Sequence, residues 1–378
     1  MQQYLFDVYP RFDLTLIRGK GCMVYDEKET GYLDLYGGHG VISIGHTHPK
    51  YVERIERQLK SIGFYSNSIN MPIQAELAER LTRQSGYPDY RLFLCNSGAE
   101  ANENALKLAS FHTGKRKIVA FKGSFHGRTS AAVNVTDNPR LSAALNRDNF
   151  PVEWLELNDE TGLEKALAAK DVAAVIVEGI QGVGGLDMPS EVFLNHLSGL
   201  TKESGAVLIL DEVQSGYGRS GQFFAHQYSG IKPDLITMAK GMGNGFPLAG
   251  VLIAPAFEAA HGMLGTTFGG NHLACAAGLA VLEVIEAENL LENAEKIGAE
   301  IAAELSTLPR VRQVKGRGLM LGLELGFPIK DLRKALLFEH HILTGSSANP
   351  NLLRILPPLT ITRENIQPFF NALKTLLS

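Results

Sequence analysis

The sequence predicts an α/β fold, in which a doubly wound, mostly parallel β-sheet carries a smaller α+β unit. Between about residues 90 and 255, short β-forming runs alternate with polar or glycine-rich turns and with stretches of helical spacing. Several runs are apolar at successive positions, as in strands that are buried on both faces of a parallel sheet. This alternation favours right-handed helical crossovers. The runs are Arg91–Cys95, Lys117–Phe121, Val172–Val177, Ala206–Leu210, Asp234–Met238 and Gly250–Ile253.

The remaining elements complete the prediction. Glu100–Phe111 and Glu191–Ser204 have helical spacing inside the α/β region. After about residue 270 the sequence predicts long helices, then short strands and a closing helix, at Leu273–Leu291, Ala294–Leu305, Val311–Val314, Leu319–Leu325 and Arg363–Leu377. We therefore expect a large α/β domain over residues 46–270, and a smaller α+β domain formed by residues 1–45 and 271–378.

Composition and charge exclude several classes of protein. The 378 residues are 45% hydrophobic and 20% charged, which is ordinary for a globular chain and excludes disordered, collagen-like and coiled-coil classes. The 36 basic and 40 acidic residues give a net charge of −4 without a basic stripe. We therefore expect no nucleic-acid or membrane partner, and any anionic ligand must be bound by local groups.

The cysteines, histidines and apolar stretches indicate a soluble protein of a reducing compartment. Three widely spaced cysteines without a CxxC pair argue against a disulfide scaffold. Neither His46-Thr47-His48 nor His340-His341 has acidic or thiol partners at metal-ligand spacing, so we expect no metal. The N-terminus lacks the pattern of a signal peptide, and Leu273–Leu282 is about half the ~20 residues that a membrane span needs. The expected location is the cytoplasm.

Chemically active side chains follow the predicted strands. Ligands of open α/β sheets bind beyond the carboxyl ends of the strands, so the residues after each run are the candidates for a site. They supply a helix N-terminus, an aromatic ring, carboxylates and a lysine to one edge of the sheet. The segments are Asn96–Ala99, Lys122–Arg128, Glu178, Asp211–Gln214 and Ala239–Gly243.

Each of these features has an alternative explanation when taken alone. Ser97-Gly98-Ala99 opens a helix whose N–H groups suit a phosphate, although a serine at this position is more commonly a plain N-cap. Asp211 ends an apolar strand, where it needs a cation or a donor, and structural pairing would satisfy it. Lys240 also ends a strand, and a buried lysine can lose its proton and attack an aldehyde, whereas most lysines lie on the surface.

The combination indicates pyridoxal 5′-phosphate. Asp211 and Lys240 are 29 positions apart, about one crossover unit, so they can lie at neighbouring strand ends. This cofactor needs a phosphate cup, an acid against its pyridinium nitrogen and a Schiff-base lysine. Phe125 would stack on the ring, with core packing as its alternative. The sequence has no GxxxxGK[ST], no GxSxG and no GxGxxG after an early strand, which argues against nucleotide-binding and serine-hydrolase sites.

These motifs identify a family resemblance over nearly the whole chain. The sequence resembles the class III aminotransferases of the type I pyridoxal-phosphate fold, and among them the N-acylornithine (acetylornithine) aminotransferases. The matching segments are Arg18–Gly21, Gly45–Pro49, Asn96–Leu108, Phe125–Arg128, Asp211–Gly216, Ala239–Gly241, Thr267–Asn271 and Arg354–Leu359.

The resemblance implies roles around the cofactor. Lys240 would attach the cofactor and move the proton, and Asp211 would hold the pyridinium nitrogen. Gln214 would bind the ring hydroxyl, and Val213 and Phe125 would sandwich the ring. The set of cofactor-binding residues is completed by Ser97, Gly98, Ala99, Glu178 and, from the other subunit of a homodimer with shared active sites, Thr267.

The resemblance also implies how substrates bind. Arg128, assisted by Tyr9, would bind the distal carboxylate of the substrate, and Arg354 would bind the α-carboxylate of glutamate. Relatives carry a glutamate that neutralises the second arginine where this sequence has Val183. We therefore hypothesise that glutamate binding is favoured and that free ornithine is a poor substrate. A second departure is His272, at a position where proline is usual.

The expected activity is transfer of the terminal amine of an N-acylated ornithine to 2-oxoglutarate, which gives a semialdehyde and glutamate in arginine biosynthesis. The acyl group can be acetyl or succinyl. Alternatives are another ω-amino acid such as ornithine or 4-aminobutyrate, a decarboxylase or aminomutase of the same fold, and a non-catalytic binding protein. The joint presence of Lys240 and Asp211 argues against the last.

Overall fold

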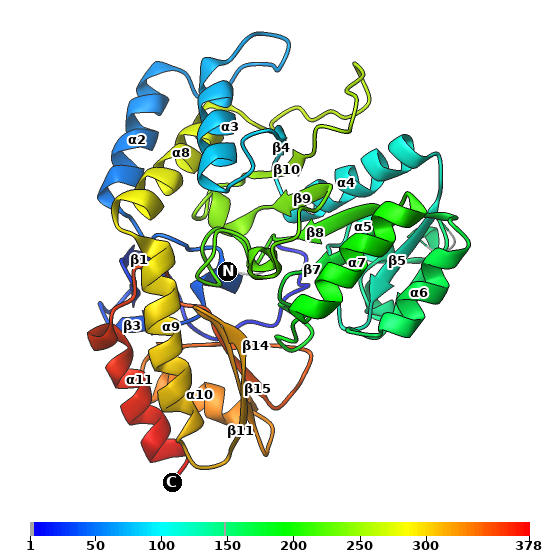
Figure 1. Cartoon of the computed structure of the whole chain (residues 1–378). Helices are drawn as coiled ribbons and strands as arrows, with labels where there is room; N and C mark the ends of the chain where they lie inside the picture. Colours follow the sequence, from blue (N-terminus) through cyan, green and yellow to red (C-terminus); the bar gives the residue numbers. More distant parts are fainter. Residues whose placement is uncertain (1–3, 147–148) are drawn as a thin grey trace.

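The computed structural model describes residues 4–146 and 149–378, which form three β-sheets flanked by helices (Figure 1). The central sheet has seven strands in the order β4-β10-β9-β8-β7-β5-β6. Their bounds are β4 Arg91–Cys95, β5 Lys117–Phe121, β6 Val152–Leu155, β7 Val172–Glu178, β8 Val207–Asp211, β9 Leu235–Met238 and β10 Ala249–Ile253. The predicted α/β architecture is confirmed.

Strand direction differs from the prediction at one position of the central sheet. Strands β9, β8, β7, β5 and β6 are parallel, but β10, predicted as one more strand of the parallel sheet, is antiparallel to both of its neighbours. Only residues 239–248 connect β9 to β10, too few for a crossover helix. Because two reversals cancel, β4 points the same way as the parallel strands, and its carboxyl end lies at the same edge of the sheet.

Strand β6 was missed by the sequence analysis. Its four residues, Val-Glu-Trp-Leu, contain a charge and form no apolar run. It lies at the edge of the central sheet and pairs only with β5, so a polar side chain is tolerated there. By contrast, all seven residues of β7 are buried, as its continuous apolar pattern predicted.

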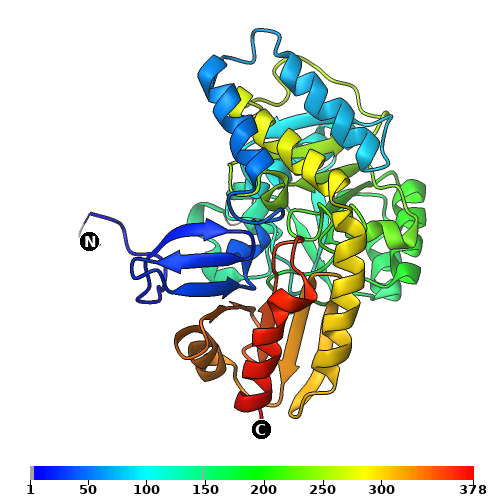
Figure 2. The same ribbon diagram turned by 90° about the vertical axis from the view of Figure 1, so that its left-hand side faces the viewer.

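Helices cover both faces of the central sheet. Helix α4 (Gly98–Thr113) packs against β7, β8, β9 and β10 through the apolar face predicted for it, which includes Ala101, Ala105 and Leu108. Helices α6 (Glu160–Ala168) and α7 (Glu191–Ser204) pack together on the opposite face. Helix α8 lies against α2 and α3 on the side shown in Figure 2. The remaining helical bounds in this part are α1 Gly37–Gly40, α2 Pro49–Ser61, α3 Pro72–Gln84, α5 Ser130–Asn134 and α8 His272–Ala287, with short 3-10 turns at η1 Pro139–Leu141, η2 Ala144–Asn146, η3 Ala225–Ser229 and η4 Lys240–Met242.

Two smaller sheets are formed by the ends of the chain. The N-terminal sheet has the order β1-β2-β3-β13, with bounds β1 Leu16–Lys20, β2 Met23–Asp26, β3 Gly31–Asp34 and β13 Ile342–Leu343. The C-terminal sheet has the order β11-β12-β15-β14, with bounds β11 Val311–Arg317, β12 Met320–Leu325, β14 Gly345–Ser346 and β15 Leu352–Ile355. Helices α9 (Leu290–Ser306), α10 (Lys330–Phe338) and α11 (Arg363–Leu376) accompany it (Figure 2).

Strand β13 brings residues from near the end of the chain into the N-terminal sheet, where it pairs in parallel with β3. The division into residues 46–270 and residues 1–45 with 271–378 stays a prediction. The predicted helix Leu273–Leu291 is shorter in the structure, because α8 stops at Ala287 and Asn289 takes a left-handed conformation, with a φ of 50°, before α9. Within the described ranges no helix is long and apolar enough to cross a membrane, and no cluster of side chains is arranged to hold a metal.

Candidate active site

Two carboxylates form the floor of the candidate site. Glu178 ends β7 and Asp211 ends β8, and the two residues are paired in register across these parallel strands. Both are nearly inaccessible, with 5% and 4% of their surfaces exposed. Burying two carboxylates side by side is costly unless donors surround them. The structure supplies those donors from four other segments of the chain.

Three hydrogen bonds fix the Asp211 carboxylate. Asn102 Nδ2 donates to Oδ2 over 2.7 Å, and the backbone N–H of Val213 donates to Oδ1 over 2.9 Å. His126 Nδ1 lies 2.7 Å from Oδ2, and the His126 ring is completely buried. Asn102 is itself held in orientation, because its amide oxygen accepts from Thr237 Oγ1 on the neighbouring strand β9. Both oxygens of Asp211 are therefore held in place by donors from the surrounding segments.

Glu178 is held by backbone donors instead. Its Oε1 accepts from the N–H of Phe125 and its Oε2 from the N–H of Gly182, both over 2.9 Å. Burial, reinforced by the neighbouring charge of Asp211 and opposed by His126 and these two N–H groups, raises the pKa of Glu178 to about 7. Near neutral pH both the protonated and the ionised forms of this carboxyl group are therefore populated, as for many groups in catalytic sites.

Lys240 lies at the same edge of the sheet. It comes two residues after the end of β9, whose Thr237 is paired with Asp211. Burial lowers the pKa of Lys240 to about 8, while the charges of Asp211 and Glu178 act in the opposite direction. A substantial share of its side chains is therefore neutral near pH 8, so the amine can act as a nucleophile.

The N-terminus of α4 forms the predicted cradle for an anion. Ser97 is its N-cap and accepts from the N–H of Glu100, whereas the N–H groups of Gly98 and Ala99 have no acceptor within the described ranges. A Cβ on Gly98 would lie 2.6 Å from Val213 Cγ1, so only glycine allows Val213 to approach this turn. Val213 is therefore placed between the Asp211 carboxylate and the helix terminus.

A buried arginine faces the site from the C-terminal sheet. Arg354, on β15, is 3% exposed, and its Nη1 donates to the carbonyl of Gly182 over 2.6 Å and to Gln214 Oε1 over 3.3 Å. Its Nε is buried, and neither Nε nor Nη2 has a partner among the described residues. Burial lowers the pKa of Arg354. The free edge formed by Nε and Nη2 matches the two oxygens of a carboxylate.

Tyr36 and His39 complete the wall near Arg354. Their rings are 4.7 Å apart and joined by a 2.7 Å hydrogen bond, and the backbone carbonyl of His39 accepts from Gln214 Nε2. Burial, aided by the positive charges of Arg354, Lys240, Arg128 and Arg333, lowers the pKa of His39 to about 4. The charges of these four cations all act on His39, and their sign favours anionic ligands beside it.

The remaining predicted residues lie at the rim. Phe125 is half-buried, and Arg128, which is exposed, lies with its guanidinium carbon 6.0 Å from the Phe125 ring centre. Thr267 is exposed in the loop before α8, and Tyr9 is 61% exposed in the N-terminal segment. The structure thus gathers the predicted residues of the central sheet and β15, and leaves Thr267 and Tyr9 without a contact to them among the described residues.

Sequence analysis gave no role to Asn102, His126, Tyr36 or His39. Asn102 was detectable in principle, because it is a polar residue on the otherwise apolar face of α4 and a buried amide needs a partner. His126 stood in a quoted motif, but its contact with Asp211 depends on the chain crossing from β5 to β8. Tyr36 and His39 reach the site from the N-terminal sheet and α1, which no local pattern indicates.

The residues present fit pyridoxal 5′-phosphate. Asp211 offers a fixed carboxylate, Lys240 an amine with a lowered pKa, and the start of α4 two free N–H groups beside a glycine that admits no Cβ. A phosphate, a ring cation and an aldehyde need this set of partners. Among the described residues, His126 Nε2 is buried and has no hydrogen-bond partner, whereas Nδ1 of the same ring contacts Asp211.

Comparisons with known proteins agree with this chemistry. The model of the family described as Aminotransferase class-III matches residues 7–377. The chain is 39% identical to the acetylornithine aminotransferase of Bacillus subtilis, over 98% of this chain and 96% of the relative, and 40% identical to that of Archaeoglobus fulgidus, over 97% and 96%. The crystal structure of the ornithine aminotransferase from Toxoplasma gondii superposes with a TM-score of 0.93 at 28% identity, covering 99% of this chain and 92% of that one.

Proposed function

We propose, from the premise that this chain belongs to the class III aminotransferase family, that it transfers the terminal amine of an N-acylated ornithine to 2-oxoglutarate. The products would be the N-acyl semialdehyde and glutamate, a step of arginine biosynthesis. The single observation that carries this proposal is the placement of Lys240 at the same sheet edge as the Asp211–Glu178 pair, where the charges of both carboxylates act on its amine. Arg354 lies in the wall of this site and Arg128 at its rim.

The cofactor of this family is pyridoxal 5′-phosphate, which supplies an aldehyde that accepts amino groups and a ring that withdraws electrons. Asp211 would bind its ring nitrogen and Gln214 its ring hydroxyl, while Val213 and Phe125 would cover the two faces. The N–H groups of Gly98 and Ala99 would bind the phosphate, next to Ser97. Glu178 would orient the backbone of Phe125 and Gly182 around this set.

Three basic residues would carry out proton transfer and substrate binding. Lys240, with its lowered pKa, would take a proton from one carbon and return it to another, since its neutral amine is present near working pH. Arg354 would bind the α-carboxylate of glutamate through Nε and Nη2, and Arg128 would bind the carboxylate of the N-acylornithine. One amino group is stored between the half-reactions, so ping-pong kinetics are expected.

The proposed enzyme is a cytoplasmic homodimer with shared active sites. In this assembly Thr267 would reach the phosphate site of the partner subunit and Tyr9 would assist Arg128. The exposure of both residues supports this arrangement, because each is accessible to a second subunit. Sedimentation or light scattering of the purified protein measures the assembly directly, and a stable monomer with full activity would overturn this part of the proposal.

Val183 bears on the choice of substrate. It follows Gly182, whose carbonyl accepts from Arg354, and an aliphatic side chain there cannot neutralise that arginine. Glu178 is the carboxylate whose charge acts on Arg354, and it lies beneath the site. We propose that Arg354 stays available to glutamate and that free ornithine is a poor donor.

A panel of amine donors tests the proposal. The purified yellow protein is mixed with acetylornithine, succinylornithine, ornithine or 4-aminobutyrate, and loss of its visible absorption band and formation of glutamate from 2-oxoglutarate are measured. An N-acylornithine is expected to be the best donor by kcat/KM. A preference for ornithine or 4-aminobutyrate would select the alternative ω-amino acid, and an unchanged band with every donor would contradict aminotransfer.

A further inference from the structure

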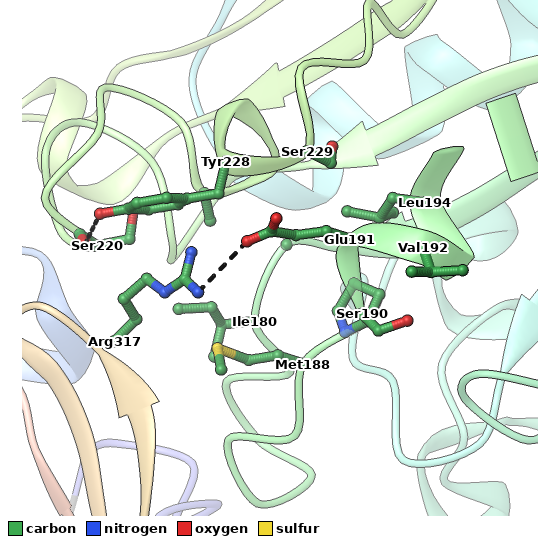
Figure 3. A pocket seen from close by; sticks show the side chains of 13 residues that line it. Ile180, Met188, Ser190, Glu191, Val192, Leu194, Ser220, Tyr228, Ser229 and Arg317 are labelled. Carbon is green, nitrogen blue, oxygen red and sulfur yellow. Dashed lines mark hydrogen bonds and ion pairs between the residues drawn. The ribbon is translucent and has the colours of Figure 1, made fainter. Parts of the chain in front are cut away.

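A cavity lies outside the active site, between the central and C-terminal sheets (Figure 3). It has a volume of about 310 Å³ and is lined by the start of α7, the η3 turn, the segment after Glu178 and the end of β11. None of its lining residues belongs to the set that surrounds Asp211 and Lys240. A volume of this order, at the lower end for ligand sites, suits a small metabolite.

The cavity contains one positive and one negative side chain. The guanidinium carbon of Arg317 lies 3.8 Å from the ring centre of Tyr228, and Arg317 Nη2 lies 3.6 Å from Glu191 Oε1. Figure 3 shows these two charged groups facing each other across the cavity. At 3.6 Å the pair is loose, and both side chains remain partly exposed, so a ligand can engage them without breaking a buried ion pair.

A buried hydroxyl and the first N–H groups of a helix lie beside the cavity. Ser220 lines the cavity and is completely buried, and its Oγ has no hydrogen-bond partner within the described ranges. The Tyr228 hydroxyl already donates a hydrogen bond, to the Ser220 carbonyl over 3.0 Å. Glu191 and Val192 are the first residues of α7, and their N–H groups, like those that open any helix, have no intrahelical acceptor. These two N–H groups are the backbone donors that the start of α7 offers to an anion.

The rest of the lining is apolar. Ile180, Met188 and Leu194 form a hydrophobic wall beside the charged pair. Ile180 belongs to a buried cluster with Met320 and with Leu352 and Leu356, which flank Arg354, and Met188 packs against this cluster. The apolar wall of the cavity therefore packs against the same residues that support β15, the strand of Arg354.

We propose that this cavity binds a free α-amino acid with an aliphatic side chain. The carboxylate would lie between Arg317 and the N-terminus of α7, the ammonium group would meet Glu191, and the side chain would cover the apolar wall. Because the cavity carries one charge of each sign, it favours a zwitterion: Glu191 opposes a dicarboxylate, and Arg317 opposes a simple amine.

Titration calorimetry of the holoenzyme with L-leucine tests the proposal. We expect saturable binding of one leucine per chain, and markedly weaker binding of leucinamide, which lacks the carboxylate, and of 4-methylpentanoate, which lacks the amine. Arg317→Gln should raise the Kd for leucine about tenfold or more, since a charge-assisted hydrogen bond is lost. Arg312→Gln is the matched control, because Arg312 is exposed on the same strand, β11, and does not line the cavity.

A second variant tests the proposal independently in case Arg317→Gln misfolds. Val192 is 69% exposed at the cavity mouth, so Val192→Phe should fill the site without disturbing the core, and should abolish leucine binding while transamination persists. If leucine binds in the active site instead, its binding should be unaffected by Arg317→Gln and by Val192→Phe. Binding that persists in the two variants, or the absence of saturable binding to the unaltered holoenzyme, would overturn the proposal, and neither outcome bears on aminotransfer itself.

Discussion

The buried floor of the active site and its rim are built in opposite ways. At the floor, both Asp211 and Glu178 are held by hydrogen bonds from distant segments, and each is less than a tenth exposed. At the rim, Arg128, Thr267 and Tyr9 are exposed on loops or on the N-terminal segment. The chain alone fixes the two carboxylates of the floor, whereas the rim is left to be completed by substrate and, as proposed, by a second subunit. Substitutions at the floor should therefore abolish chemistry, and those at the rim should alter affinity.

The largest effect is expected at Lys240. Lys240→Ala removes the amine that attaches the cofactor and carries the proton, so kcat should fall by ~10⁴-fold or more. The measurement is glutamate formation together with the absorption spectrum of the purified variant. Lys202→Ala, on the exposed side of α7, should leave both unchanged. Substantial residual turnover in Lys240→Ala would show that the floor does not contain the reacting amine.

Asp211→Asn tests whether the reaction needs the negative charge of Asp211 and not only its shape. The amide has nearly the same size but is uncharged and offers the ring nitrogen no anion, so kcat should fall by ~10³-fold while the fold is retained. Glu178→Gln should lower kcat by a smaller factor, because Glu178 acts through the backbone of Phe125 and Gly182. Kinetics and circular dichroism of both variants are compared. An effect of Glu178→Gln larger than that of Asp211→Asn would reverse this ranking.

The two arginines allow the wall and the rim to be compared directly. Arg354→Gln should raise KM for glutamate by ~10²-fold and affect the N-acylornithine much less, and Arg128→Gln should do the reverse, because each loses a bidentate pair with one carboxylate. Arg140→Gln, an exposed arginine in a 3-10 turn, serves as the control. Equal losses for both substrates in both variants would contradict separate roles.

A pH titration probes Lys240 without substitution. The pKa of Lys240 is lowered to about 8, so the neutral amine that binds an aldehyde becomes the major form above this pH and is lost below it. The rate of cofactor uptake by the cofactor-free protein should therefore rise roughly tenfold between about pH 7 and pH 9. A flat profile, measured by stopped-flow absorbance, would mean that the amine is not shielded as the structure indicates.

The smallest expected effect is at Val183, between floor and rim. Val183→Glu introduces a carboxylate beside the segment that binds Arg354. It should shift the preference from glutamate towards the ω-amine donor by about fivefold, equivalent to ~1 kcal/mol. Val183→Gln controls for size. An unchanged ratio of the two half-reaction rates would refute the proposed role of this position.

Sequence reasoning succeeded where local pattern and burial coincide. The apolar runs that end in Glu178 and Asp211 are the buried strands β7 and β8, and each ends one residue later than predicted, so these carboxylates belong to the strands. The direction of β10 was missed because the prediction judged each run by its composition and not by the length of the connection before it. The hydrogen bonds from Asn102 and His126 to Asp211, and the approach of Tyr36 to Arg354, join residues far apart in the chain, and no periodicity encodes them.

The short connection between β9 and β10 has a consequence for protein engineering. Lys240 lies in a tight reversal between two neighbouring strands of one sheet, with a φ of 45° that few residues other than glycine adopt. Loops at the outer ends of the covering helices tolerate added residues, but an insertion within this connection would move Lys240 relative to Asp211, which pairs with Thr237 on β9. Designers who graft new loops onto this scaffold should vary the rim and leave that reversal at its natural length.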